Sequence, residues 1–229
     1  MAQADWCAPL RPGLVTGLAA EARVAARLGA ALAGGGLPEG AEAAAERLVA
    51  EGATALVSFG LCGGLDPALD AGALLVPRAV HDAGDAYPTD PALSAALGGW
   101  NGAALAAATA PVARREAKRA LFAATGAAGV DLESGAVARV AARHGLPFAV
   151  LRAVCDPADL DLPPLALTAL DAGGTVRPAR VAASLLARPG QIGALLRLAR
   201  AAAAARAALV GRVGDILDHG GGSSGGLVA

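Results

Sequence analysis

The stretch LPFAVLRAVCDPADL, residues 146–160, ends a long apolar run with two carboxylates. Residues 146–154 predict a buried strand of a parallel sheet, and Asp156 and Asp159 follow it directly. Asp156-Pro157 has the form of a helix N-cap followed by a first-turn proline. A carboxyl group kept out of water has a raised pKa and can donate a proton. The sequence therefore leaves two interpretations open at Asp156, a helix cap and a catalytic acid.

The pattern on either side of this strand predicts an α/β protein. Apolar runs alternate with runs of helix-forming residues, which is typical of a mostly parallel sheet covered on both faces. We expect a single three-layer domain over residues 1–218, with a mixed, mostly parallel sheet flanked by helices, and a flexible Gly/Ser tail at 219–229. The expected strands are 13–17, 53–60, 73–80 and 146–154, with a short strand and a helix over 129–145, helices at 18–32, 40–52, 91–97 and 113–126, and loops at 60–72 and 81–91.

Composition excludes several classes of function. Of the 229 residues 55% are hydrophobic, but much of this is alanine, and no run of roughly 18 bulky apolar residues could span a membrane. The first residues lack the features of a signal peptide, so we expect a cytoplasmic protein. Three cysteines without ligand spacing argue against a disulfide framework and against a metal site. A net charge of -1 and 3% aromatic residues give no basis for binding nucleic acid.

Chemically useful residues gather where the predicted strands end. The candidates are Gly17, the glycine-rich FGLCGG (59–64), VDLES (130–134) and CDPAD (155–159). Ligands of open parallel sheets bind beyond the carboxyl ends of the strands, so these groups are expected to share one site. Each has a structural alternative, because glycines make tight turns and Asp131 or Ser134 can cap a helix.

Three of these motifs, in order along the chain, resemble a known superfamily. They are SFGLCGGLDPALDAGALLVP (58–77), VDLESGAVARVA (130–141) and LPFAVLRAVCDPADLDLP (146–163). Together they are similar to the purine nucleoside phosphorylase and methylthioadenosine/S-adenosylhomocysteine nucleosidase superfamily. YPTD (87–90) and RPGQIGALLRLAR (188–200) resemble its hopanoid-associated phosphorylase branch.

The resemblance implies a role for several residues. Glu133 would bind the ribose hydroxyls, with Leu132 in place of the family's methionine. Asp156, after Cys155, would act as the general acid that protonates the leaving purine. Pro111, beside Val112, would stand where nucleosidases carry an aromatic residue that stacks on the base.

The nucleophile is less clearly marked. Nucleosidases activate water with a glutamate at the place of Ala22, and Glu21 lies one residue before it. The glycines Gly17, Gly60 and Gly63, with Arg23, are the candidate phosphate ligands. The branch favours phosphorolysis, with phosphate as co-substrate and no cofactor. A hydrolytic nucleosidase and a non-catalytic nucleoside-binding protein are the alternatives.

The implied substrate is a 5′-substituted adenosine, and in this branch adenosylhopane, which would give adenine and phosphoribosyl hopane. Family members associate, so we expect a homo-oligomer. Residues 177–217 predict two arginine-bearing helices, interrupted at Pro189-Gly190, that pack on the sheet. Because the implied substrate is a lipid, these helices are also a candidate for peripheral membrane contact.

Overall fold

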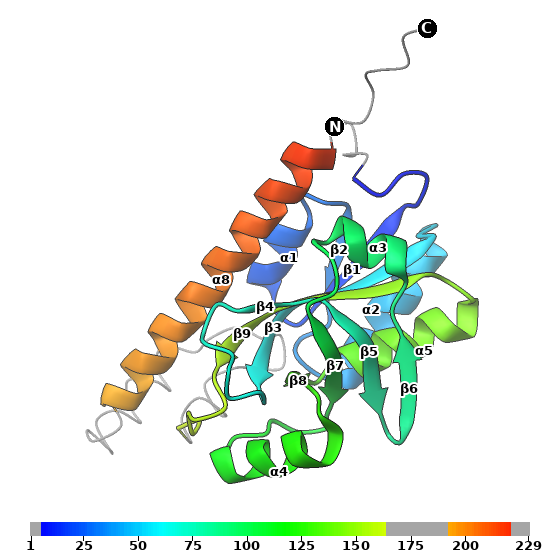
Figure 1. Ribbon diagram of the computed structural model, residues 1–229. Coiled ribbons are helices and arrows are strands. Elements are labelled where there is room, and N and C mark those ends of the chain that lie inside the picture. Colours follow the sequence, from blue (N-terminus) through cyan, green and yellow to red (C-terminus); the bar gives the residue numbers. More distant parts are fainter. Residues whose placement is uncertain (1–5, 164–191, 221–229) are drawn as a thin grey trace, which may run out of the picture.

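The computed structural model describes residues 6–163 and 192–220 (Figure 1). Within these residues nine strands form one sheet in the order β2-β1-β3-β8-β7-β5-β6, and β9 pairs with both β3 and β4. The strands are β1 (Pro12–Thr16), β2 (Ala30–Ala33), β3 (Ala55–Gly64), β4 (Leu74–Leu75), β5 (Pro77–Asp82), β6 (Asp85–Pro88), β7 (Gly102–Ala107), β8 (Gly129–Asp131) and β9 (Phe148–Asp156).

The centre of the sheet is the parallel pair β3 and β9. Their register runs from Leu56 opposite Phe148 to Gly63 opposite Asp156. Almost every residue of β9 is buried, because apolar layers cover both faces of the sheet. The carboxyl ends of β3 and β9 therefore lie together, and this brings the glycine-rich segment beside Asp156.

Helices cover both faces of the sheet, as Figure 1 shows. On one face α2 (Pro38–Ala50) and α5 (Ser134–His144) bury alanine, valine and leucine side chains against the strands. On the other face lie α1 (Ala19–Ala25), α3 (Pro91–Ala96) and the long α8 (Ile192–Gly220). The short α4 (Arg115–Thr125) lies beyond the carboxyl end of the sheet. The predicted three-layer α/β architecture is confirmed.

The N-terminal helix is shorter than predicted. We expected one helix over 18–32, but α1 ends at Ala25 and β2 begins at Ala30, parallel to β1. Alanine favours helices, but the free edge of β1 offers backbone hydrogen bonds to the following segment. Tertiary pairing outweighs a propensity of a few tenths of a kcal/mol per residue.

Two segments predicted as loops contain strands. The glycine-rich residues 60–64 continue β3, with a register shift between Cys62 and Gly63, because their backbone pairs with β9. In the predicted loop 81–91, β5 continues to Asp82 and β6 pairs with it as an antiparallel hairpin turned by Ala83 and Gly84, both at positive φ.

At the C-terminal end, α8 is the second of the two predicted helices, and it extends to Gly220. Residues 219 and 220, predicted as tail, are thus helical, while 221–229 lie outside the described residues. The first predicted helix and the interruption at Pro189-Gly190 also lie outside them. None of the described helices is long and apolar enough to cross a membrane.

Candidate active site

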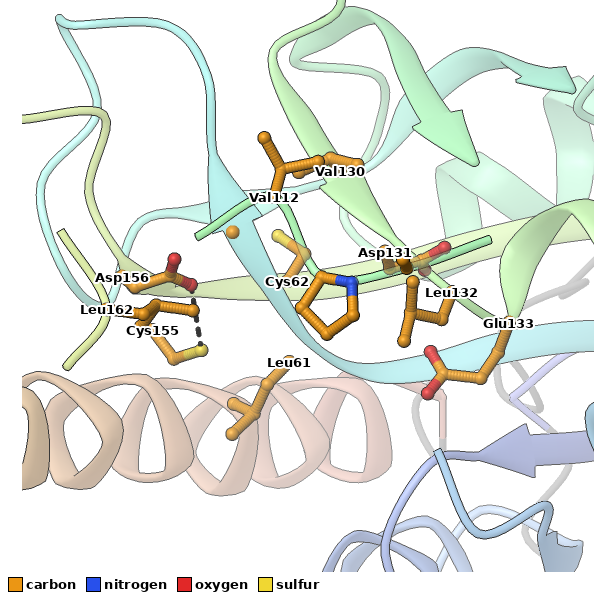
Figure 2. A pocket seen from close by; sticks show the side chains of 13 residues that line it. Leu61, Cys62, Val112, Val130, Asp131, Leu132, Glu133, Cys155, Asp156 and Leu162 are labelled. Carbon is orange, nitrogen blue, oxygen red and sulfur yellow. Dashed lines mark hydrogen bonds between the residues drawn. The ribbon is translucent and has the colours of Figure 1, made fainter. Parts of the chain in front are cut away.

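A pocket opens at the carboxyl ends of β3, β8 and β9 (Figure 2). Asp156 and Glu133, the two predicted acids, lie at opposite ends of it, with Leu61 and Leu132 along the space between them. The other predicted residues in its lining are Gly63, Val112 and Cys155. The side chains of Asp156, at the end of β9, and of Glu133, just after β8, thus open onto one pocket.

The local fold after β8 explains how Glu133 is held. Asp131 ends β8 and accepts a hydrogen bond at Oδ1 from the backbone N–H of Ser134, 3.0 Å away, which caps α5. Glu133 lies between these two residues, at the N-cap position of α5. Its carboxylate is directed into the pocket and is 3.1 Å, Oε2 to Nη2, from Arg152.

Arg152, in the middle of β9, contacts several of the groups at this end of the site. Its side chain is 1% exposed, and its Nε lies 2.7 Å from Asp131 Oδ2. Nη2 also donates to Ser58 Oγ (2.6 Å), and Nη1 donates to the carbonyl of Leu61 (3.1 Å). A buried guanidinium needs such partners, because an unpaired buried charge is strongly destabilising.

Glu21, on α1, is a third carboxylate at this end of the site. It is buried, and it accepts hydrogen bonds from the backbone N–H groups of Leu18 (Oε2, 2.8 Å) and Leu61 (Oε1, 3.2 Å). The bond to Leu18 satisfies the N-terminus of α1, which is one structural reason for a glutamate here. The bond to Leu61 ties α1 to the end of β3.

The charges at this end of the site do not balance. The carboxylates of Glu21, Asp131 and Glu133 surround one guanidinium, that of Arg152. Burial raises the pKa of Glu133 to about 7; Arg152 opposes this shift, and Asp131 and Glu21 add to it. Burial likewise raises the pKa of Glu21, against the effect of Arg152. When all three carboxyl groups are ionised, they leave an excess of negative charge beside the pocket.

Asp156 lies at the other end and is also buried. Burial raises its pKa, and the ammonium group of Lys118, 2.6 Å from Oδ2, opposes this shift. The thiol of Cys155 lies 3.4 Å from Oδ1 (Figure 2). No helix begins after Pro157 among the residues described up to 163, so the helix-cap interpretation of Asp156 is wrong. Asp159 is exposed.

The predicted phosphate ligands lie in different surroundings. A β-carbon on Gly17 would be 2.7 Å from Glu133 Oε1, and one on Gly60 would be 2.8 Å from Glu21 Oε2. Both glycines therefore lie against the carboxylates of the site. Gly63 lines the pocket next to Asp156 instead. Arg23 is exposed on α1 and is not among the residues that line the pocket.

Sequence reasoning missed Arg152, Lys118 and the burial of Glu21. Arg152 is the one charge within the apolar run 146–154, which was a detectable signal. Lys118 stands in a basic, mostly exposed helix, and its neighbours gave no reason to single it out.

Comparison with known proteins identifies the superfamily and the fold. The sequence profile of the phosphorylase superfamily matches residues 26–186. Among curated proteins, none is significantly similar to the chain in sequence.

Several solved structures share the fold. A Helicobacter pylori 5′-methylthioadenosine/S-adenosyl homocysteine nucleosidase, complexed with a substituted pyrrolidin-3-ol, has a TM-score of 0.67 at 15% identity, covering 91% of this chain and 97% of that one. The Streptococcus pyogenes S-adenosylhomocysteine nucleosidase, in complex with 5-methylthiotubericidin, has a TM-score of 0.60 at 18% identity, covering 66% and 86%. Futalosine hydrolase of H. pylori has a TM-score of 0.59 at 18% identity, covering 65% and 85%.

The superfamily match and the shared fold define an enzyme of the nucleoside phosphorylase or nucleosidase type. The chain belongs to the phosphorylase superfamily.

Proposed function

We propose that this enzyme cleaves the N-glycosidic bond of a 5′-substituted adenosine and releases adenine. The observation that carries the proposal is the placement of Asp156 and Glu133 at opposite ends of one pocket. Breaking this bond leaves negative charge on the purine and positive charge on the ribose. An acid at one end and a carboxylate at the other match both needs.

At the base end, Asp156 donates a proton to the leaving purine. Burial raises its pKa, so it keeps a proton to a higher pH than an exposed aspartate. Val112 and Cys155 form the walls against which the base would lie. A positioned general acid contributes about 10²- to 10⁴-fold to a rate.

At the sugar end, Glu133 accepts hydrogen bonds from the ribose hydroxyls. Three carboxylates around one guanidinium leave excess negative charge where the ribose becomes cationic. Such a preorganised field favours the transition state over the neutral substrate.

The geometry favours water as the nucleophile. Glu21 lies against Gly17 and Gly60, two of the candidate phosphate ligands, and its charge repels an anion there. A buried glutamate with a raised pKa is also a suitable general base. Phosphate is the second candidate, because Arg152 Nη1 lies 3.0 Å from the place of a β-carbon on Gly60.

The resemblance to the hopanoid-associated branch supports a lipidic 5′ group, with adenosylhopane as the substrate. On α8, the exposed Leu196 and Val210 lie near the exposed Arg197, Arg200 and Arg206, which suits an anionic membrane surface. Flotation with anionic and with zwitterionic liposomes tests this contact. Protein that stays at the bottom of both gradients contradicts it.

One assay separates the candidate functions. Free adenine is measured from 5′-methylthioadenosine, S-adenosylhomocysteine and adenosylhopane, each with and without inorganic phosphate. Release that does not depend on phosphate supports hydrolysis, and release only with phosphate supports phosphorolysis. Substrate binding without release would leave the chain as a nucleoside-binding protein and would overturn the proposal.

A further inference from the structure

Lys118 on α4 has an environment that its helix does not predict. Its side chain is 0% exposed, although α4 is otherwise largely exposed. Lysine is almost never fully buried unless it is paired, because removing the ammonium group from water is costly. The residue therefore needs a reason to lie inside the protein.

The ammonium group of Lys118 is surrounded by oxygens from one segment. Besides Asp156 Oδ2, it reaches the backbone carbonyls of Asp156 (3.0 Å), Pro157 (2.9 Å) and Leu160 (3.1 Å). An ammonium has three N–H donors, so these acceptors satisfy it completely. Of the two oxygens of the Asp156 carboxylate, Oδ2 is thus held by Lys118, while Oδ1 meets the Cys155 thiol in the pocket wall.

The segment after Asp156 is tied to α4 at further points. Asp161 Oδ1 accepts a hydrogen bond from the backbone N–H of Arg115 (2.8 Å), at the start of α4. The backbone N–H of Leu162 donates to the carbonyl of Ala113 (2.8 Å). The residues just before α4 include Val112, which lines the pocket. The residues just before α4 and the segment that begins with Asp156 therefore form one wall of the base end, and α4 holds that segment in place.

From these contacts we infer that Lys118 is a positioning residue for the general acid: it holds Asp156 in the pocket and stabilises the carboxylate that Asp156 becomes when its proton leaves. The inference rests on the proposed function. In the step itself, the bond between the ribose and the purine breaks with its electron pair going to the purine. The proton of Asp156 passes to a purine nitrogen, and the oxygen of a water molecule bonds to the ribose carbon and loses a proton. That proton, taken up through the solvent, restores the Asp156 carboxyl group after the products leave.

The groups around this pair support the assignment. Cys155 on β9 and Cys62 on β3 face Asp156, and burial raises the pKa of both thiols, so they stay neutral. Asp161 lies on the far side, near Lys118. Of these groups, Lys118 alone is a cation, and it offsets the effect of burial on Asp156. Without it the carboxylate would be harder to form and Asp156 would be a weaker acid.

The test is the pH dependence of kcat for adenine release by wild type and Lys118→Met, with 5′-methylthioadenosine as the probe. An opposite charge within about 4–6 Å lowers an aspartate pKa by about 1–3 units. At high pH kcat decreases as Asp156 loses its proton, and this decrease is the alkaline limb of the profile. In Lys118→Met the alkaline limb should move to a pH higher by about 1–3 units. The plateau should fall, within the ~10²- to 10⁴-fold that a general acid supplies. Arg119→Met, an exposed neighbour on α4, is the matched control and should change neither.

Each outcome decides the inference. A lower rate at every pH with the alkaline limb unmoved means that Lys118 only holds the fold, and this overturns it. If circular dichroism shows that Lys118→Met does not fold, Lys118→Arg decides, because it keeps the charge and should keep the limb in place. A limb displaced in Lys118→Arg then contradicts the inference. Wild-type activity in Asp156→Asn would instead overturn the proposed function, which is a distinguishable failure.

Discussion

Glu21 and Glu133 direct their carboxylates at the same glycine, Gly17, from two helices far apart in the sequence. A β-carbon on Gly17 would lie 3.4 Å from Glu21 Oε2 and 2.7 Å from Glu133 Oε1. Each carboxylate thereby makes the other harder to ionise, and Glu21 contributes to the raised pKa of Glu133. The carboxylates of Glu21 and Glu133 repel each other, and a positive charge that develops on the ribose would offset this repulsion.

This repulsion predicts how stability depends on pH. Glu133 has a pKa of about 7 in the folded state, against an ordinary glutamate value of 4.5. Between these values the folded state holds a proton that the unfolded chain has lost, so the free energy of unfolding falls as pH rises through this window. Above about pH 7 the group causes no further change.

The variant Glu133→Gln should remove this dependence. Urea unfolding at about pH 5 and about pH 8 should show a smaller loss of stability in Glu133→Gln than in wild type. The variant should also release adenine far more slowly, because it cannot accept the same hydrogen bonds from the ribose. Equal pH slopes in the two proteins would contradict the raised pKa of Glu133.

The same group should appear in the kinetics. Ribose binding needs the ionised Glu133, so kcat/KM should decrease as pH falls below about 7. This limb reports the free enzyme, and it should lie well above the ordinary range of a glutamate. A profile that stays flat down to about pH 5 would show that Glu133 is already ionised there or does not bind the sugar.

Gly17 should not tolerate a side chain. In Gly17→Ala the new methyl group displaces the Glu133 carboxylate, and a misplacement of about 1 Å can cost about 10²-fold in rate. Gly211→Ala on α8 is the control, since nothing lies within 4 Å of its β-carbon position. It should keep full activity and gain about 0.5–1 kcal/mol of stability from helix propensity. Activity measured alongside thermal unfolding separates the two effects.

Ser58 should matter for stability through Arg152. Its hydroxyl accepts from Arg152 Nη2 and from Ser134 Oγ. Ser58→Ala leaves a buried guanidinium N–H without this partner, at a cost of about 1–3 kcal/mol in urea unfolding. Ser94 is equally buried, but its Oγ has no hydrogen-bond partner among the described residues, so Ser94→Ala should cost less. Equal losses would show that the Arg152 network does not depend on Ser58.

Much of the fold was predictable because its central strands appear in the sequence as apolar runs. Buried strands were indicated by the apolar runs 146–154 and 53–60. The alternation of such runs with helical segments predicted a sheet with a layer of helices on each face. The strand β2 was not predictable, because its residues AALA favour a helix and only pairing with the edge of β1 makes them a strand. The hairpin β5–β6 was not predictable either, because its residues lie in a polar segment and only their pairing makes them strands.

Some residues of the candidate site were predictable from the sequence and others were not. Glu133 and Asp156 follow strands directly, so their meeting at one edge of the sheet could be predicted. Arg152 and Glu21 meet across 131 residues of sequence, and no local pattern encodes such a pairing. Alignment on Gly17 placed the water-activating glutamate of nucleosidases at Ala22. In this chain the first turn of α1 instead directs Glu21 back toward the site.

The central claim is that Asp156 protonates the leaving base, and Asp156→Asn tests it most directly. Asparagine keeps the shape but has no carboxyl proton to give. In single-turnover assays near neutral pH, adenine release should fall by about 10²-fold or more, with the substrate still bound and the protein folded. Release by Asp156→Asn at the wild-type rate would contradict the account.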